Sequence, residues 1–395
     1  MAGDLYCGDN LDLLRNEIAA ESVDLVYLDP PFNSARTYHL VPRDGAGPER
    51  RGGRTSDPPS TGRTSEREKE RAFLDVWEWD DAARRSYGEL ICPTFASATP
   101  SRLPSLMRAL KDVLGPERID TLAYLSMMAV RLVELRRVLR PTGSLYLHCD
   151  PTASHYLKLV MDAIFGAECF RNEIIWRYRR WPTKARRFQR MHDVLLFYTA
   201  RGGNAHAFHT LYGYEKLADS TLKTFGGRKQ RADFASGHRK PGVEEGDSDG
   251  PPLCDFWDVE DVKINGAPLS DAWEIGVIAP IGRERTGFPT QKPEKLLERV
   301  VRASSREGDL VLDPFCGSGT ALVVAEQQRR RWVGMDASIR AIEIVKARLA
   351  REVPDQRAWT EHGAATGEAA RCKRARRAPP PFAGVSLVER AAGSP

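Results

Sequence analysis

The chain has 395 residues, of which 41% are hydrophobic and 29% charged, so it is long enough for one large α/β domain or two smaller ones. Its net charge of +5 is too small to indicate a polyanionic partner by itself. No basic segment followed by an apolar run opens the chain, and no apolar stretch approaches the ~20 residues of a membrane span, so we expect neither a signal peptide nor a membrane protein.

The first residues predict alternating strands and helices. Leu5 to Cys7 is a short strand candidate, and Asn10 is a candidate N-cap for a helix from Leu11 to Ala19. Val23 to Leu28 is almost continuously apolar, which is typical of a parallel strand buried on both faces. This strand ends at Asp29-Pro30-Pro31, because proline cannot continue a central strand.

The strand exit Asp29-Pro30-Pro31-Phe32 carries the first chemical signal. Loops beyond the carboxyl ends of parallel strands are where such sheets bind ligands. The lone pair of an amine on a base ring is delocalised, so the amine is a poor nucleophile. Asp29 and the Pro30 carbonyl could accept both amine hydrogens and free that lone pair, while Phe32 could stack on an extruded base. The alternative is a merely proline-rich strand exit.

The middle of the chain alternates between structured and polar stretches. Residues 42–72 are rich in Gly, Pro, Arg, Ser and Thr and predict a disordered loop, with structure resuming near Phe73. Apolar spacing then predicts a helix from Ala123 to Leu139, a strand from Ser144 to Cys149 and a helix from His155 to Phe165.

A basic, aromatic segment lies between two further predicted strands, Glu173 to Arg177 and Val194 to Tyr198. Its cations could neutralise DNA phosphates and its aromatic rings could stack or wedge, although such a charge run could also be a solvated loop. The residues proposed to contact DNA are Arg177, Arg179, Arg180, Lys184, Arg186, Arg187 and Arg190. Residues 200–270 are polar and weakly periodic, which indicates an inserted recognition region.

Regular alternation returns near Pro293. The predicted elements are helix Lys295 to Ala303, strand Leu310 to Leu312, helix Thr320 to Gln328, strand Trp332 to Met335 and helix Ile339 to Arg351. Residues 353–395 have the composition of a disordered basic tail.

The turn Asp313-Pro314-Phe315-Cys316-Gly317-Ser318-Gly319-Thr320 joins a predicted strand to a helix. This arrangement lets a ligand approach backbone amides at a helix N-terminus. Asp336 ends the next strand, where an acid typically binds ribose hydroxyls; the alternative is an ordinary turn with an incidental acid. A P-loop is a poor fit because Thr320, not lysine, follows Gly319, and a dinucleotide-binding turn is a poor fit because a third glycine is missing.

Together these motifs resemble a known family. Asp29 to Phe32 matches the catalytic motif of amino-directed DNA methyltransferases, and Asp313 to Thr320 matches their cofactor motif. The order, catalytic motif first, is similar to their permuted β-type arrangement. Thr290-Gln291-Lys292-Pro293 resembles the segment that caps the methionine end of the cofactor, and Asp9, followed by Asn10, resembles the early acid near it. The resemblance covers residues 4–41, 73–200 and 271–350.

The resemblance implies a site-specific DNA methyltransferase that uses S-adenosylmethionine, flips its target base and transfers the methyl group directly. The Asp-Pro-Pro-aromatic form of the motif favours adenine N6, although Phe32 stands where tyrosine is frequent. Cytosine N4 is the nearest alternative. A catalytically idle DNA-binding relative and a nicotinamide oxidoreductase are further alternatives. The implied cofactor site comprises Asp9, Asn10, Thr290, Gln291, Lys292, Pro293, Asp313, Pro314, Phe315, Gly317, Ser318, Gly319, Thr320 and Asp336.

The implied fold is α/β, with a doubly wound, mostly parallel, Rossmann-like methyltransferase sheet. Residues 1–41 and 73–200 form the catalytic half, residues 271–352 the cofactor-binding half, and residues 200–270 the target-recognition region. The seven cysteines contain no CxxC pair, so we expect reduced thiols in a cytoplasmic protein without a metal site. Double-stranded DNA is the expected partner. A homodimer and a separate restriction endonuclease are left open.

Overall fold

The computed structural model describes the chain in ordered stretches. They are residues 3–33, 36–39, 71–92, 100–178, 186, 188–213, 230–233, 238–241, 267–268, 271–279, 282–353, 359–362 and 387–388. The predicted loop 42–72 and the recognition region 200–270 therefore lie mostly outside the described residues.

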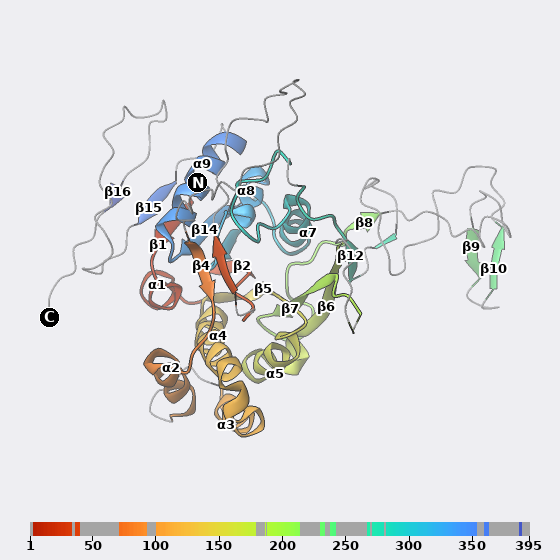
Figure 1. The fold of residues 1–395 in the computed structure, drawn as a ribbon. Coiled ribbons are helices and arrows are strands. Elements are labelled where there is room, and N and C mark those ends of the chain that lie inside the picture. The colour runs from red at the N-terminus through yellow and green to blue at the C-terminus, as the bar shows by residue number, and fades with distance from the viewer. Residues whose placement is uncertain are drawn as a thin grey trace, which may run out of the picture.

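A mostly parallel sheet forms the centre of the molecule (Figure 1). In the described part of the chain its order is β12 (Ala272–Glu274), β6 (Phe170–Arg177), β7 (His192–Thr199), β5 (Leu139–Cys149), β2 (Val23–Leu28), β13 (Leu310–Asp313), β14 (Arg331–Asp336), β1 (Asp4–Cys7), β15 (Thr360–His362) and β16 (Leu387–Val388). Strand β7 runs antiparallel to both of its neighbours, and the other neighbouring pairs are parallel.

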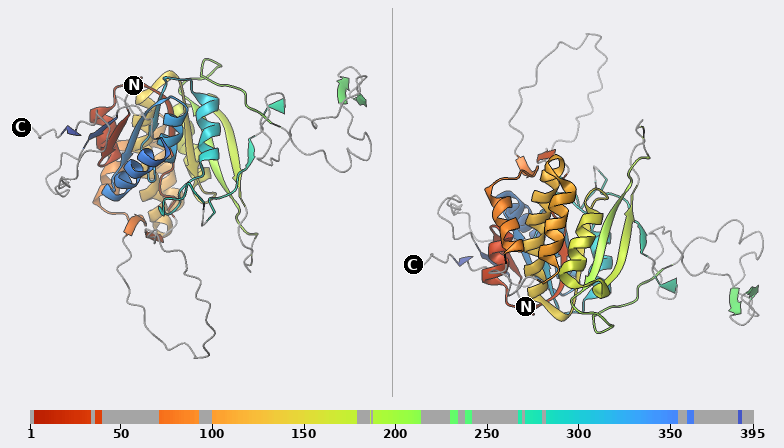
Figure 2. Two further views of the ribbon diagram at one scale, coloured as in Figure 1. Left: turned by 90° about the horizontal axis from the view of Figure 1, so that it is seen from above. Right: turned by 90° about the horizontal axis from the view of Figure 1, so that it is seen from below.

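Helices cover both faces of the sheet, as the two views of Figure 2 show. One apolar core packs under α1 (Asn10–Glu17), α2 (Asp81–Ile91), α3 (Leu103–Leu114), α4 (Ile119–Val138) and α5 (Ser154–Phe165). A second core packs under α7 (Glu294–Ser304), α8 (Thr320–Gln327) and α9 (Ile339–Glu352). The strands are apolar on both faces because both are covered, which confirms the predicted doubly wound α/β fold.

Several elements differ from the sequence-based expectations. The α1 N-cap is Asp9, whose carboxylate accepts the Leu11 N–H at 2.7 Å, so the prediction of Asn10 as the cap is wrong. Asn10 is instead buried, and its amide donates to the Pro314 carbonyl at 2.7 Å. The sequence analysis did not predict α2 and α3, whose apolar positions are interspersed with charged residues.

Part of the predicted basic tail belongs to the sheet. Strand β15 pairs with β1, and just before it Trp359 packs beside the buried Trp332. His362 stacks on Tyr6 with ring centroids 4.2 Å apart and contacts Asp4 at 3.0 Å. The expectation of disorder across 353–395 therefore does not hold for 359–362. The aromatic rings of this short stretch bury apolar surface, which the overall composition of the tail does not indicate.

Smaller elements complete the described structure. Strands β3 (Arg36–His39) and β4 (Arg71–Asp75) form an antiparallel ribbon, so the first two residues of β4 lie within the expected 42–72 loop. The remaining short elements are η2 (Pro116–Arg118), η3 (Ala167–Cys169), β8 (Tyr212–Gly213), β9 (Gln230–Asp233), β10 (His238–Pro241) and β11 (Ala267–Pro268).

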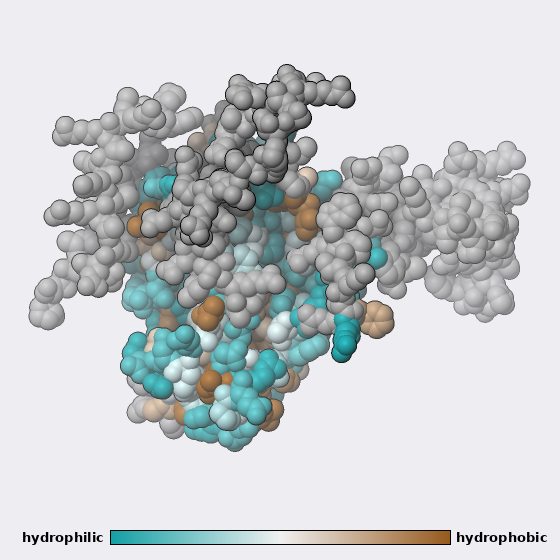
Figure 3. Space-filling model, in the orientation of Figure 1, coloured by the Kyte–Doolittle hydropathy of each residue, from teal (hydrophilic) through white to brown (hydrophobic). Residues whose placement is uncertain are grey.

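Hydrophilic residues dominate the coloured part of the face drawn in Figure 3. On the face drawn in Figure 3, hydrophobic residues form separate spots among hydrophilic ones. Within the ranges given above, none of the helices has the length and apolar content that crossing a bilayer requires.

Candidate active site

The two sequence motifs lie at one edge of the sheet. Strands β2 and β13 are parallel neighbours, with Val26 opposite Leu312, so the turns that follow them leave the sheet side by side. A cavity of about 250 Å³ lies between these turns. Its lining includes Gly8, Asp9, Asn10, Asp29, Pro30, Pro31, Phe32, Thr290, Gln291, Lys292, Asp313, Pro314, Phe315, Gly317, Ser318, Thr320 and Asp336. The cavity brings together residues that are far apart in the chain. Asn10 and Pro314, for example, are 304 positions apart and in direct contact.

The glycine turn after β13 is shaped to bring backbone close to the cavity. Gly317 has φ +49° and Gly319 has φ +74°, a backbone region that residues other than glycine rarely adopt. A Cβ atom at Gly317 would lie 3.0 Å from the ring of Phe288. The Gly317 N–H donates to the Asp336 carboxylate at 2.9 Å, which fixes the turn against the end of β14.

Two carboxyl groups near the glycine turn, those of Asp336 and Asp313, have raised pKa values. Burial raises the pKa of Asp336 to about 6, although its hydrogen bonds from the Ser338 and Gly317 N–H groups lower it. Burial also raises the pKa of Asp313 well above its usual range, and the nearby carboxylates of Asp29 and Asp336 add to this effect. Asp313 accepts the Phe315 N–H at 3.1 Å, so this side chain acts within the turn.

The two carboxylate oxygens of Asp29 differ in their hydrogen bonds to the described residues. Its Oδ2 accepts a hydrogen bond from Lys292 Nζ at 2.6 Å. Its Oδ1 is buried and has no hydrogen-bond partner among the described residues. A buried carboxylate oxygen without a donor is costly, so this atom is suited to a donor that a ligand supplies.

The Asp-Pro-Pro-Phe turn is held by a residue that the sequence analysis missed. Asp75, at the end of β4, accepts the backbone N–H groups of Phe32 at 3.3 Å and Asn33 at 2.8 Å. Asn33 has φ +59°, so the chain reverses sharply just after the motif. The Lys292 ammonium lies 5.1 Å from the centre of the Phe32 ring, and this ring remains partly exposed at the cavity.

The segment 290–293 has more than one role. Lys292 points toward Asp29, and the Gln291 side chain accepts the Thr286 N–H at 2.8 Å and donates to the Glu284 carbonyl. Thr290 lies at the cavity with φ +63°, and Pro293 is the N-cap residue of α7. Three of the four residues therefore line the cavity, and Pro293 begins the neighbouring helix instead.

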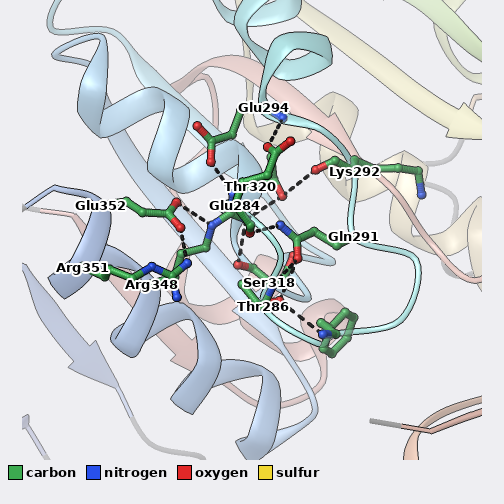
Figure 4. A network of polar contacts seen from close by, with 11 residues as sticks. Glu284, Thr286, Gln291, Lys292, Glu294, Ser318, Thr320, Arg348, Arg351 and Glu352 are labelled. Carbon is green, nitrogen blue, oxygen red and sulfur yellow. Dashed lines mark hydrogen bonds and ion pairs between the residues drawn. The ribbon is translucent and has the colours of Figure 1, made fainter. Parts of the chain in front are cut away.

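A fully buried arginine joins this segment to the glycine turn (Figure 4). Arg348 on α9 donates to Thr320 Oγ1 at 2.8 Å, to Glu294 at 2.6 Å and to Glu352 at 2.8 Å. The Thr320 hydroxyl donates to the Lys292 carbonyl at 3.1 Å. The start of α8 and the segment that carries Lys292 are consequently one connected unit.

Arg131 is a second cation that the sequence analysis missed. Its guanidinium donates to the Asn10 side chain at 2.6 Å and to the Asp9 carboxylate at 2.9 Å. Burial lowers the pKa of Arg131, which the neighbouring Asp9 opposes. Together with the bond from Asn10 to Pro314, this contact ties the start of α1 to the turn after β13.

The proposed DNA contacts are only partly described. Arg177 pairs with Glu274, and Arg190 donates to Thr152 at 2.7 Å. Arg186 is exposed, and Phe188 close to it is fully exposed. The remaining four, Arg179, Arg180, Lys184 and Arg187, lie outside the described residues.

Comparison with known proteins identifies the family. A model of a DNA methylase family, N6_N4, matches residues 23–347. The chain belongs to the N6_N4 DNA methylase family. The chain is 31% identical over 265 residues to the type II methyltransferase M.EcaI of Enterobacter cloacae, covering 58% of each chain. It is 29% identical over 229 residues to M.HpaI of Haemophilus parainfluenzae, covering 58% of this chain and 60% of that one.

The chain spans less than two thirds of the length of these curated relatives. Among solved structures, it is similar to TTHA0409 of Thermus thermophilus, a proposed DNA modification methylase in complex with S-adenosyl-L-methionine. That similarity has a TM-score of 0.45 and 18% identity, and it covers 92% of this chain and 100% of the other.

Proposed function

We propose that this methylase transfers a methyl group from S-adenosylmethionine to the N6 amine of adenine in double-stranded DNA. The observation that carries the proposal is the meeting of Asp29 and the Gly317 turn at one cavity, on neighbouring strands. Such a transfer needs two parts. One is a carboxylate that holds the amine, and the other is a glycine turn that admits a nucleotide-like ligand.

The residues around the cavity fit the cofactor. Gly317 leaves space that a side chain would fill against Phe288, and Asp336 offers carboxylate oxygens at the end of β14 for ribose hydroxyls. Asp9 and Asn10 lie at the same edge, after β1. When bound, S-adenosylmethionine supplies an electrophilic methyl group on its sulfonium sulfur.

The chain's own residues then position and polarise the amine. Asp29 Oδ1 accepts one amine hydrogen, and the Pro30 carbonyl accepts the other, which draws the nitrogen toward tetrahedral geometry. Phe32 stacks on the flipped base. Lys292 holds Oδ2, so that the carboxylate keeps one orientation. No covalent enzyme intermediate is needed, and the released amine proton passes to water.

Sequence features support the finer assignments. The Asp-Pro-Pro-Phe form of the motif favours adenine N6 over cytosine N4. Catalytic strand β2 precedes cofactor strand β13 in the chain, which supports the permuted β-type arrangement. We assign recognition of a specific DNA sequence to residues 200–270 and to the basic segment that begins at Arg177.

The test combines one variant with two measurements. Nucleosides from DNA treated with the wild-type protein should contain 6-methyladenine by mass spectrometry. The Asp29→Ala variant should lose this product while calorimetric titration still detects S-adenosylmethionine binding. Detection of 4-methylcytosine without 6-methyladenine would overturn the choice of base. Absence of cofactor binding by the wild-type protein would overturn the enzyme hypothesis itself.

A further inference from the structure

A chain of buried polar side chains lies behind Asp29, and the proposed reaction has not used it. His148 on β5 is fully buried between β2 and β7. Its Nδ1 lies 2.9 Å from the Tyr27 hydroxyl, and its Nε2 lies 3.3 Å from Asp193 Oδ2. The Tyr178 hydroxyl donates to Asp193 Oδ1 at 2.9 Å. Four side chains from three neighbouring strands and the end of β6 thus form one connected path.

This path ends directly behind the catalytic turn. His148 Nδ1 lies 3.9 Å from Asp29 Oδ1, the carboxylate oxygen that has no hydrogen-bond partner among the described residues. The ring centres of His148 and Phe32 are 5.7 Å apart. A hydrogen on Nδ1 would be donated to the Tyr27 hydroxyl, and its positive charge would lie near the oxygen that is to accept the target amine.

The partners of His148 determine which ring nitrogen carries the proton. Burial raises the pKa of Asp193, but its hydrogen bonds from His148 and Tyr178 and the nearby Lys292 charge lower it by more, so Asp193 stays an acceptor-only carboxylate. Burial raises the pKa of Tyr27 well above its usual range, so Tyr27 keeps its proton and remains a donor. Nε2 consequently carries the hydrogen toward Asp193, and Nδ1 accepts the hydrogen of Tyr27.

We propose that Asp193 fixes the Nε2–H tautomer of His148 and thereby keeps Asp29 Oδ1 free to accept the target amine. The inference rests on the proposed role of Asp29 and makes His148 and Asp193 positioning residues for methyl transfer. The reversed tautomer would donate its N–H to the Tyr27 hydroxyl, and the positive end of this N–H, with Nδ1 3.9 Å from Oδ1, would make that oxygen a weaker acceptor for the amine.

The decisive variant is Asp193→Asn, whose amide can donate to Nε2 and so force the hydrogen onto Nδ1. We expect a fall in kcat for methyl transfer of at least about tenfold, in line with the effect of an imposed wrong tautomer. The Kd for S-adenosylmethionine, measured by calorimetry, should stay within about twofold, because Asp193 does not line the cavity. Tyr178→Phe is the matched control: it removes the other hydrogen bond of Asp193, and its kcat should stay within about threefold of wild type.

Nitrogen-15 NMR of histidine rings gives a readout that is independent of activity. The His148 signals, assigned by their loss in His148→Gln, should show Nε2–H in the wild-type protein and Nδ1–H in Asp193→Asn. A wild-type His148 with its proton on Nδ1 would overturn the inference even if Asp193→Asn did not fold. An unchanged kcat in Asp193→Asn with a reversed tautomer would also overturn it. If Asp29→Ala kept full activity, the proposed function itself would fail, whatever the tautomer.

Discussion

The two turns that meet at the cavity are stabilised in different ways. The turn after β13 is fixed mainly by nearby chain: Gly317 donates to Asp336, 19 positions further on, and Cys316 donates to the Met335 carbonyl, while one distant side chain, Asn10, donates to the Pro314 carbonyl. The turn after β2 is fixed by distant side chains. Lys292, 263 positions away, holds Asp29, and Asp75 holds the next two backbone N–H groups. The turn after β13 is thus held mainly by chain close to it in the sequence, whereas the turn after β2 depends on side chains from distant parts of the fold.

The largest expected effect is at the distant contact of the catalytic turn. Lys292→Met keeps most of the apolar stem but removes the ammonium from Asp29, so we expect methyl transfer in single-turnover assays to fall on the order of 10²-fold. The paired side chains are only 9% and 18% exposed, so the unpaired carboxylate should also lower the free energy of unfolding by about 3 kcal/mol. Lys292→Arg, which keeps the charge with a different shape, should be less impaired. Activity of Lys292→Met within about threefold of wild type would show that the catalytic turn does not need this contact.

A smaller effect is expected at the glycine turn after β13. Gly317→Ala places a Cβ at φ +49° and 3.0 Å from Phe288, so the calorimetric Kd for S-adenosylmethionine should rise about tenfold. Gly115→Ala is the matched control, because Gly115 has φ +58° and a Cβ there meets nothing within 4 Å. The control should lose a similar amount of stability and keep its cofactor affinity. Equal cofactor affinities for the two variants would contradict the assignment of this turn.

The smallest effect is a pH dependence of stability and of cofactor affinity, which we expect to arise from Asp336. The pKa of Asp336 is about 6 in the folded chain, against an ordinary value of 3.8, so the folded state binds this proton more tightly than the unfolded state does. The contribution of Asp336 to the free energy of unfolding should therefore fall as the pH rises from about 4 to about 6. Cofactor affinity should change in the opposite direction, since only the carboxylate accepts two ribose hydroxyls.

Calorimetric titrations with S-adenosylmethionine between about pH 5 and about pH 8 check this expectation. We expect the wild-type affinity to weaken several-fold below about pH 6, and the affinity of Asp336→Asn to be weaker and nearly independent of pH over the same range. A wild-type affinity that stays constant down to about pH 5 would argue against a hydrogen-bonding role for this carboxylate.

The sequence predicted the parts of the site that depend on short-range patterns. Apolar runs ending in Asp-Pro-Pro or in a glycine turn indicated β2 and β13, and the parallel architecture followed from their two-sided burial. The meeting of the two turns at one edge could be inferred from the family resemblance and is confirmed by the pairing of β2 with β13.

Residues that act across long sequence separations escaped prediction. Arg348, Arg131 and His148 lie within apolar helical or strand patterns, where a single polar residue gives no indication of its partner. Asp193 follows His192 in the sequence, but its side chain contacts His148, 45 positions earlier. In the same way, Asn10 was predicted to cap α1 but Asp9 does so, and only the tertiary contact of Asn10 with Pro314 explains why.

The strand order also has a consequence for the nascent polypeptide. Strand β1 lies between β14 and β15, so a newly made β1 has neither of its sheet neighbours until Arg331 and the residues after it have been synthesised. Strand β2 can pair with β5 earlier, but its other edge waits for β13. Unpaired strand edges are prone to aggregate during this interval. Dependence on chaperones during synthesis is therefore expected to be concentrated in these N-terminal strands.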